Sequence, residues 1–132
     1  MKAGSDMQAS LKKSIIVLLG VGHTNAHIVR MWKMHPLANA ELVCISNYPV
    51  ATYSGMLPGV LSGQYAPEQM EIDLVRLCKS VGCRLIIDRV QTIDRERKLI
   101  LFERRCPLSY DVMSIGIGSR PATSQVEFSA DA

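Results

Sequence analysis

An uninterrupted apolar run, Ile15 to Leu19, opens the patterned part of the chain. The run is rich in β-branched residues and leucine and does not alternate with polar positions, which is typical of a strand buried on both faces in a parallel sheet. After Gly20 and Gly22, apolar residues recur with helical spacing as far as Trp32, and His35-Pro36 ends the predicted helix. The pattern therefore predicts a strand and a helix joined by a glycine turn.

Strand and helix patterns continue to alternate further along the chain. Glu41 to Ile45 predicts a second strand, which completes a βαβ unit with a right-handed crossover. A helix is predicted to begin at Pro67 and to end at Gly82, and the strand Arg84 to Ile87 follows it. The apolar stripe of this helix consists of Met70, Leu74, Leu77, Cys78 and Val81.

The last part of the pattern predicts antiparallel structure and then one more buried strand. Val90 to Ile93 and Leu99 to Phe102 flank a polar turn, and Tyr110 to Ile117 predicts the final strand. The expected fold class is α/β, with a parallel βαβαβ core, helices packed on the sheet and a β-hairpin before the last strand. We expect residues 1–13 to be a flexible leader, residues 14–121 to be one partial domain and residues 122–132 to be a polar tail.

The glycine turn carries the first candidate chemistry. In dinucleotide-binding domains one glycine makes the tight turn after the strand, and a second leaves room for the diphosphate at the helix N-terminus. Gly20 and Gly22 occupy these positions, but Asn25 stands where a third glycine would allow close packing of helix and strand. The turn predicts a nucleotide site, and a plain tight turn between strand and helix is the alternative.

The tip of the second strand differs from the usual dinucleotide pattern. An acidic residue commonly holds the ribose there, whereas this chain has Ser46 and Asn47. A hydroxyl can still bond a ribose, though less strongly than a carboxylate does. The missing carboxylate weakens NAD as the nucleotide, and no arginine sits beside Ser46 to favour the 2′-phosphate of NADP, so NAD(P) stays open only as the alternative to FAD.

Composition and charge narrow the classes of protein. The chain has 132 residues, 48% of them hydrophobic and 20% charged, which predicts one domain with a real core. A net charge of +3 is too small to indicate nucleic acid as the partner. No run approaches the ~20 apolar residues of a transmembrane helix, and the run at Ile15 to Leu19 is too short for a signal peptide. Together with four cysteines that need not pair, this predicts a cytoplasmic protein with reduced thiols.

Three other patterns are weaker candidates for chemistry. Cys78 and Cys83 have the spacing of a redox pair but close a helix and enter a strand, so we interpret each as a small buried hydrophobe. His23 and His27 lie four apart without a third ligand, so no metal is predicted. The basic run from Arg84 to Arg105 alternates with acidic residues, as in a solvated hairpin.

Four segments together resemble a known family: "IIVLLGVGHTNAHIV", "YSGMLPGVLSGQY", "EIDLVRL" and "YDVMSIGIGSRP". They are similar to the N-terminal half of the FAD-binding domain in pyridine nucleotide-disulfide oxidoreductase-like flavoproteins. The resemblance is nearest to the type II NADH dehydrogenase-like branch, including the flavoprotein module fused to selenide, water dikinase, and covers roughly residues 14–121. It implies a Rossmann-type FAD/NAD(P)-binding half-domain.

The resemblance also implies roles for individual residues. The FAD diphosphate would be surrounded by Gly20, Gly22, His23, Thr24 and Asn25. Ser46 and Asn47 would stand near the adenosine ribose, and Val90 would present its backbone to the adenine. Ser54, in the loop Tyr53 to Pro58, would face the flavin, and Gly118, in the last turn, would pack near the dinucleotide. No catalytic residue and no metal ligand is implied.

The chain matches only part of such a flavoprotein. It stops before the NAD(P)H-binding domain and the later FAD segment, so NAD(P)H is expected only with the missing domain. We therefore expect the chain to bind FAD as part of an NAD(P)H-dependent oxidoreductase and to be inactive alone. The non-enzymatic alternative is a half-domain that forms a homodimer, or binds a partner, through an uncovered face of its sheet.

Overall fold

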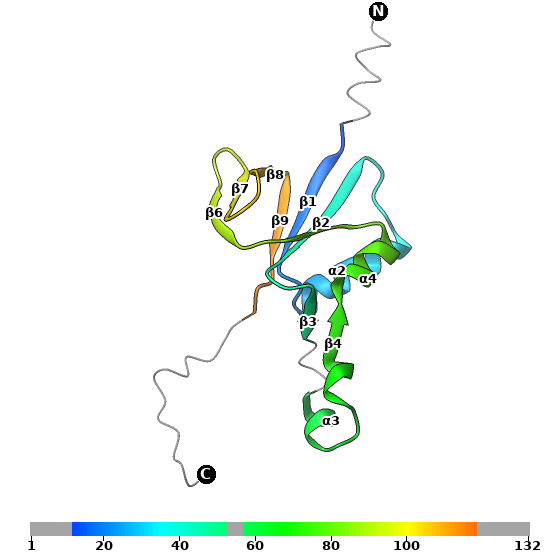
Figure 1. The fold of residues 1–132 in the computed structure, drawn as a ribbon. Coiled ribbons are helices and arrows are strands. Elements are labelled where there is room, and N and C mark those ends of the chain that lie inside the picture. The colour runs from blue at the N-terminus through cyan, green and yellow to red at the C-terminus, as the bar shows by residue number, and fades with distance from the viewer. Residues whose placement is uncertain (1–11, 53–56, 119–132) are drawn as a thin grey trace, which may run out of the picture.

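The computed structural model describes residues 12–52 and 57–118, and its centre is a parallel sheet (Figure 1). The four strands are β1 (Ser14–Leu19), β2 (Ala40–Ser46), β5 (Arg84–Ile87) and β9 (Val112–Ile115), in the order β5-β2-β1-β9. All three pairings are parallel. The α/β class and the parallel core predicted from the apolar runs are therefore confirmed.

Two helices, α2 (His23–Met34) and α4 (Leu74–Val81), cover one face of this sheet (Figure 1). Val29 from α2 and Leu74 from α4 are both fully buried against Leu18 and Leu42 of the sheet. Because Leu18 and Leu42 lie on neighbouring strands, one apolar layer joins the two helices to β1 and β2. The first helix forms where its spacing predicts it.

The other face of the sheet is covered by antiparallel strands. These are β6 (Val90–Asp94), β7 (Leu99–Phe102) and the short β8 (Leu108–Ser109), in the order β6-β7-β8. Ile100 and Phe102 of β7 pack against Val17, Val43 and Ile45 of the central sheet. The uncovered face that we expected to mediate a homodimer is therefore covered by the hairpin region, because the side chains of β7 alternate and turn one apolar row onto the sheet.

A projection separates β2 from α4, and here the structure corrects the sequence prediction. The segment predicted as one helix from Pro67 consists of a 3₁₀ turn η2 (Pro67–Met70), the strand β4 (Glu71–Asp73) and only then α4. β4 pairs antiparallel with β3 (Val50–Thr52). The Asp73 carboxylate accepts a hydrogen bond from the Arg76 backbone N–H at 3.1 Å, which makes Asp73 the N-cap of the helix.

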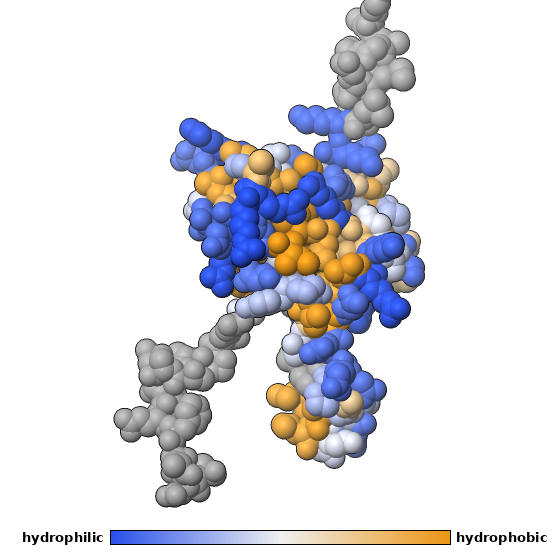
Figure 2. All heavy atoms as spheres, viewed as in Figure 1, coloured by the Kyte–Doolittle hydropathy of each residue, from blue (hydrophilic) through white to orange (hydrophobic). Residues whose placement is uncertain are grey.

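The projection ends in the short helix α3 (Leu57–Leu61) (Figure 1). Figure 2 shows hydrophobic residues gathered at this end, where Leu57 and Leu61 are exposed. Residues 53–56, which include Ser54, lie outside the described part of the chain. The flavin-side role implied for Ser54 therefore stays a prediction.

Candidate nucleotide-binding cleft

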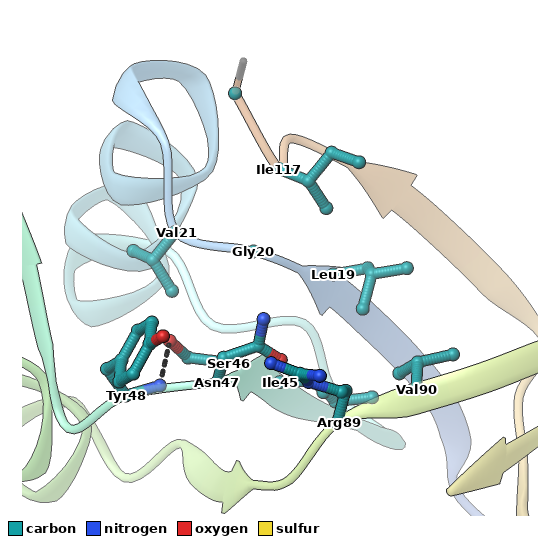
Figure 3. A pocket seen from close by; sticks show the side chains of 11 residues that line it. Leu19, Gly20, Val21, Ile45, Ser46, Asn47, Tyr48, Arg89, Val90 and Ile117 are labelled. Carbon is teal, nitrogen blue, oxygen red and sulfur yellow. Dashed lines mark hydrogen bonds between the residues drawn. The ribbon is translucent and has the colours of Figure 1, made fainter. Parts of the chain in front are cut away.

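A cleft of about 530 Å³ opens at the carboxyl ends of the parallel strands (Figure 3). It lies where the chain leaves β1, β2 and β9 and where it enters β6. Its lining residues are Leu19, Gly20, Val21, Ile45, Ser46, Asn47, Tyr48, Arg89, Val90, Ile117 and Gly118. Open α/β sheets bind ligands at this end, at the position where strand order reverses, and here the reversal falls between β1 and β9.

The turn after β1 has a backbone that only glycine fits. Gly20 has φ +79°, and a Cβ atom on it would lie 2.6 Å from the carbonyl oxygen of Gly116. Gly22 packs against the same carbonyl: its N–H donates to the Gly116 oxygen at 3.2 Å, and a Cβ would lie 2.9 Å from that oxygen. Both glycines are thus required by close contact with the turn after β9, and they keep the start of α2 tight against that turn.

Asn25 occupies the third position of the glycine fingerprint and is fully buried. Its Nδ2 donates to the Gly20 carbonyl at 2.8 Å and to the Ser114 carbonyl at 3.3 Å, and its Oδ1 accepts from the Ser114 hydroxyl at 2.8 Å. A Cβ on Gly116 would lie 2.8 Å from Nδ2. The glycine that the usual fingerprint places on the helix is in effect replaced by Gly116 in the turn after β9, and the Asn25 amide links β1, α2 and β9 by hydrogen bonds.

The N-terminus of α2 faces the same end of the sheet. Gly22 is its N-cap, no side chain caps it, and its first turn holds no acidic residue. An α-helix leaves its first backbone N–H groups without helical partners and carries partial positive charge at this end. His23 and Thr24 are exposed in the first turn, so their backbone and side chains border the cleft region without lining the cleft itself.

The end of β2 presents polar groups to the cleft. Ser46 and Asn47 both line it, and the Ser46 hydroxyl oxygen accepts a hydrogen bond from the Tyr48 backbone N–H at 3.2 Å (Figure 3). That bond uses the hydroxyl as an acceptor and leaves its own hydrogen available for donation. Ser46 and Asn47 therefore both line the cleft, and their contact with a ribose stays a prediction.

Arg89 is a cleft residue that the sequence reasoning missed. The Asp88 N–H donates to the Ser46 carbonyl at 3.0 Å, and the buried Asp88 carboxylate accepts from the backbone N–H of Arg89 at 2.7 Å and of Arg104 at 3.3 Å. This network sets the sharp exit from β5, and Figure 3 shows the Arg89 side chain extending across the end of β2. The conclusion that no arginine stands beside Ser46 was wrong, because strand pairing brings together residues far apart in sequence.

The structure thus brings together five of the ten predicted site residues in one cleft: Gly20, Ser46, Asn47, Val90 and Gly118. Gly22, His23 and Thr24 lie beside it at the start of α2. The Asn25 side chain is occupied inside the fold, so it positions the glycine turn. The cleft adds Arg89, which the alternation of charges alone could not distinguish from a solvated hairpin residue.

A second group of side chains lies away from this cleft, on the helix side of the sheet. Cys44, Cys78 and Cys83 are free, buried thiols whose sulfur atoms all lie within 4.8 Å of one another. Hydrogen bonding to Cys78 and to Cys83, together with burial, raises the pKa of the Cys44 thiol far above its ordinary value. Cys78 and Cys83 are buried small residues, as predicted, but their meeting with Cys44 was not predicted.

Sequence comparison finds no protein-family model and no curated protein that matches the chain. Comparison of structures does find similar folds. A sulfide:quinone oxidoreductase from Aquifex aeolicus superposes with a TM-score of 0.68 at 18% identity, over 81% of this chain and 25% of that one. NDH2 from Plasmodium falciparum superposes with a TM-score of 0.69 at 18% identity, over 86% of this chain and 24% of that one. A NAD-dependent persulfide reductase from A. fulgidus superposes with a TM-score of 0.69 at 21% identity, over 86% of this chain and 23% of that one.

The chain has the fold of pyridine nucleotide-disulfide oxidoreductases. It spans about a quarter of the length of these oxidoreductases. Within the part of the chain that the structure describes, no helix combines the length and apolarity that crossing a bilayer requires. In this fold the glycine turn and the tip of β2 both line the cleft at the end of the parallel sheet where the strand order reverses.

Proposed function

We propose that this chain binds the ADP half of FAD, as the N-terminal part of an NAD(P)H-dependent flavin oxidoreductase. The observation that carries the proposal is the position of the cleft. A glycine turn without room for side chains, an uncapped helix N-terminus and the polar tip of β2 all meet at the strand-order reversal of a parallel sheet.

The diphosphate would lie over the glycine turn. The close packing of Gly20 and Gly22 against Gly116 fixes the shape of the turn, and the N-terminus of α2 supplies N–H donors and a favourable dipole. His23 and Thr24, exposed in that first turn, would flank the phosphates. Asn25 stabilises this arrangement because its side-chain amide donates hydrogen bonds to the carbonyl of Gly20 and to the carbonyl of Ser114 in β9.

The adenosine would extend across the tips of β2 and β6. The Ser46 hydroxyl and the Asn47 amide offer neutral hydrogen bonds to the ribose. Val90, at the start of β6, together with Leu19 and Ile45, gives the adenine an apolar wall. Gly118 and the loop containing Ser54 would approach the flavin half, and hydride transfer from NAD(P)H would need the remaining domains.

Arg89 supports a second candidate ligand. It contributes a positive charge to a cleft wall that carries no carboxylate among the described lining residues. Arginine recognises phosphate with a planar fork of donors, and an arginine near the ribose can accommodate the 2′-phosphate of NADP. The same chain could in this way hold NADP(H), and the two ligands differ in the group that Arg89 would contact.

Calorimetric titration tests both ligands. Wild type is titrated with FAD, ADP, NADH and adenosine 2′,5′-bisphosphate, alongside Ser46→Ala and Arg89→Gln. The matched control is Arg84→Gln, which removes an exposed arginine at the opposite end of β5. If FAD is the ligand, FAD and ADP bind and Ser46→Ala weakens both.

If NADP is the ligand, the 2′,5′-bisphosphate binds more tightly than ADP, and Arg89→Gln removes that preference while Arg84→Gln does not. A folded wild type that binds none of the four compounds would overturn the proposal. Binding that Ser46→Ala and Arg89→Gln leave unchanged would also overturn it, because the ligand would then lie outside this cleft.

A further inference from the structure

Three cysteines from three separate elements meet on the helix side of the sheet. Cys44 lies in β2, Cys78 in the last turn of α4, and Cys83 directly before β5. The sulfur atoms of Cys44 and Cys83 are 3.3 Å apart, and all three sulfurs lie within 4.8 Å of one another. The side chains are 0%, 2% and 8% exposed, respectively, so they face one another inside the core.

The spacing of these sulfurs suits one three-coordinate ion. Thiolate sulfur binds metals at about 2.3 Å, so an ion in the plane of three sulfurs would hold them about 4.0 Å apart. The sulfurs of Cys44 and Cys83 are 3.3 Å apart, somewhat closer than this, and no two of the three sulfurs are more than 4.8 Å apart. Side-chain adjustments of less than about 1 Å would therefore bring all three sulfurs to bonding distance.

The surroundings select the kind of ion. Structural zinc takes four ligands, and among the described residues no fourth His, Cys, Asp or Glu joins the three cysteines. Water is a poor fourth ligand here because Leu42 and Leu74, both almost fully buried, belong to the same apolar cluster as the cysteines. Soft thiolate ligands favour Cu(I), which does not need a fourth ligand.

We propose that Cys44, Cys78 and Cys83 form a binding site for a single Cu(I) ion. The three sulfurs bind the ion as thiolates, because a cysteine must lose its thiol proton to become a metal ligand. Binding of one Cu(I) ion therefore releases the three thiol protons to solvent. No electron is transferred in this step.

The test is anaerobic titration of the purified protein with Cu(I) in competition with a colorimetric Cu(I) chelator. Wild type should take up one equivalent, develop thiolate-to-copper ultraviolet absorption and release about three protons per ion. Cys44→Ala, Cys78→Ala and Cys83→Ala should each weaken binding roughly a hundredfold or more, since even changes around metal ligands cost 10–100-fold. Cys106→Ala is the matched control, because Cys106 is the exposed cysteine, and it should bind as wild type does.

Circular dichroism confirms that each variant is folded, and a second measurement needs no variant. Wild type with and without Cu(I) is alkylated after partial unfolding in urea, and the modified cysteines are located by mass spectrometry. Bound Cu(I) should protect the three buried cysteines and leave Cys106 modified. Folded wild type that takes up no Cu(I), uptake that depends on Cys106, or tighter binding of Zn(II) than of Cu(I) at the same three cysteines would overturn the proposal.

Discussion

The contact between Asn25 and Gly116 gives a prediction that can be worked from distances. Asn25→Ala removes three hydrogen bonds, two donated to carbonyls and one accepted from the Ser114 hydroxyl. At about 1 kcal/mol net for each bond, this should lower the free energy of unfolding by about 2–4 kcal/mol. Gly116→Ala alone should cost about 1–3 kcal/mol, because the new methyl would lie 2.8 Å from Nδ2 and 3.1 Å from Cγ of Asn25.

The stability costs of Asn25→Ala and Gly116→Ala should not be additive. In the Asn25→Ala background the atoms that clash with the new methyl are gone, so Gly116→Ala should then cost almost nothing, and the coupling energy should be about 1–3 kcal/mol. Urea unfolding, followed by the fluorescence of the single tryptophan Trp32, measures the free energy of unfolding of wild type, the two single variants and the double variant. Gly82→Ala serves as a control, because Gly82 has φ +77° and open space around its Cβ position, so its cost should add to that of Asn25→Ala. Additive costs for Gly116→Ala and Asn25→Ala would refute this reasoning.

Three further substitutions test other parts of the fold, each by urea unfolding. Asp73→Ala removes the N-cap of α4 and should cost about 1 kcal/mol, while Asp73→Asn should restore most of it; a loss that asparagine does not restore would contradict the cap. Ile100→Ala should cost about 2–5 kcal/mol because Ile100 is fully buried between the two sheets, whereas Ile117→Ala, at a position 71% exposed, should change stability by less than about 0.5 kcal/mol. Gly20→Ala should cost more than about 1 kcal/mol and abolish nucleotide binding, since it combines a positive φ with a 2.6 Å clash; unchanged stability would show that the turn adapts.

The local elements could largely be predicted from the sequence. The apolar run of β1, the glycine turn and the spacing of α2 each depend on neighbouring residues, and the structure has all three where they were expected. The helix predicted from Pro67 was wrong over its first turns. Its predicted apolar stripe passed from Met70 to Leu74 with no member in β4, and the pairing of β4 with β3 makes that segment extended.

The cleft could be predicted only in part, because its members differ in how far their contacts reach along the chain. Gly20 and Ser46 follow directly from strand ends and could be found from spacing. Arg89 could not, since its place beside Ser46 depends on the hydrogen bond between the β2 tip and Asp88. The three cysteines meet for a similar reason: β2 pairs with β5 and α4 packs over both, and no local pattern encodes that meeting.

The glycine turn after β1 has a consequence for the order of folding. Its shape depends on Gly116 and Ser114, and the hydrogen bond from Ser114 to Asn25 joins residues 89 positions apart. Contacts across such long loops form late, because closing the loop costs entropy before any contact repays it. A chain emerging from the ribosome would therefore make β1, α2 and β2 early, while the turn between β1 and α2 acquires its final geometry only when β9 arrives. A nucleotide that binds this turn would act on the last folding step and slow unfolding more than it speeds folding.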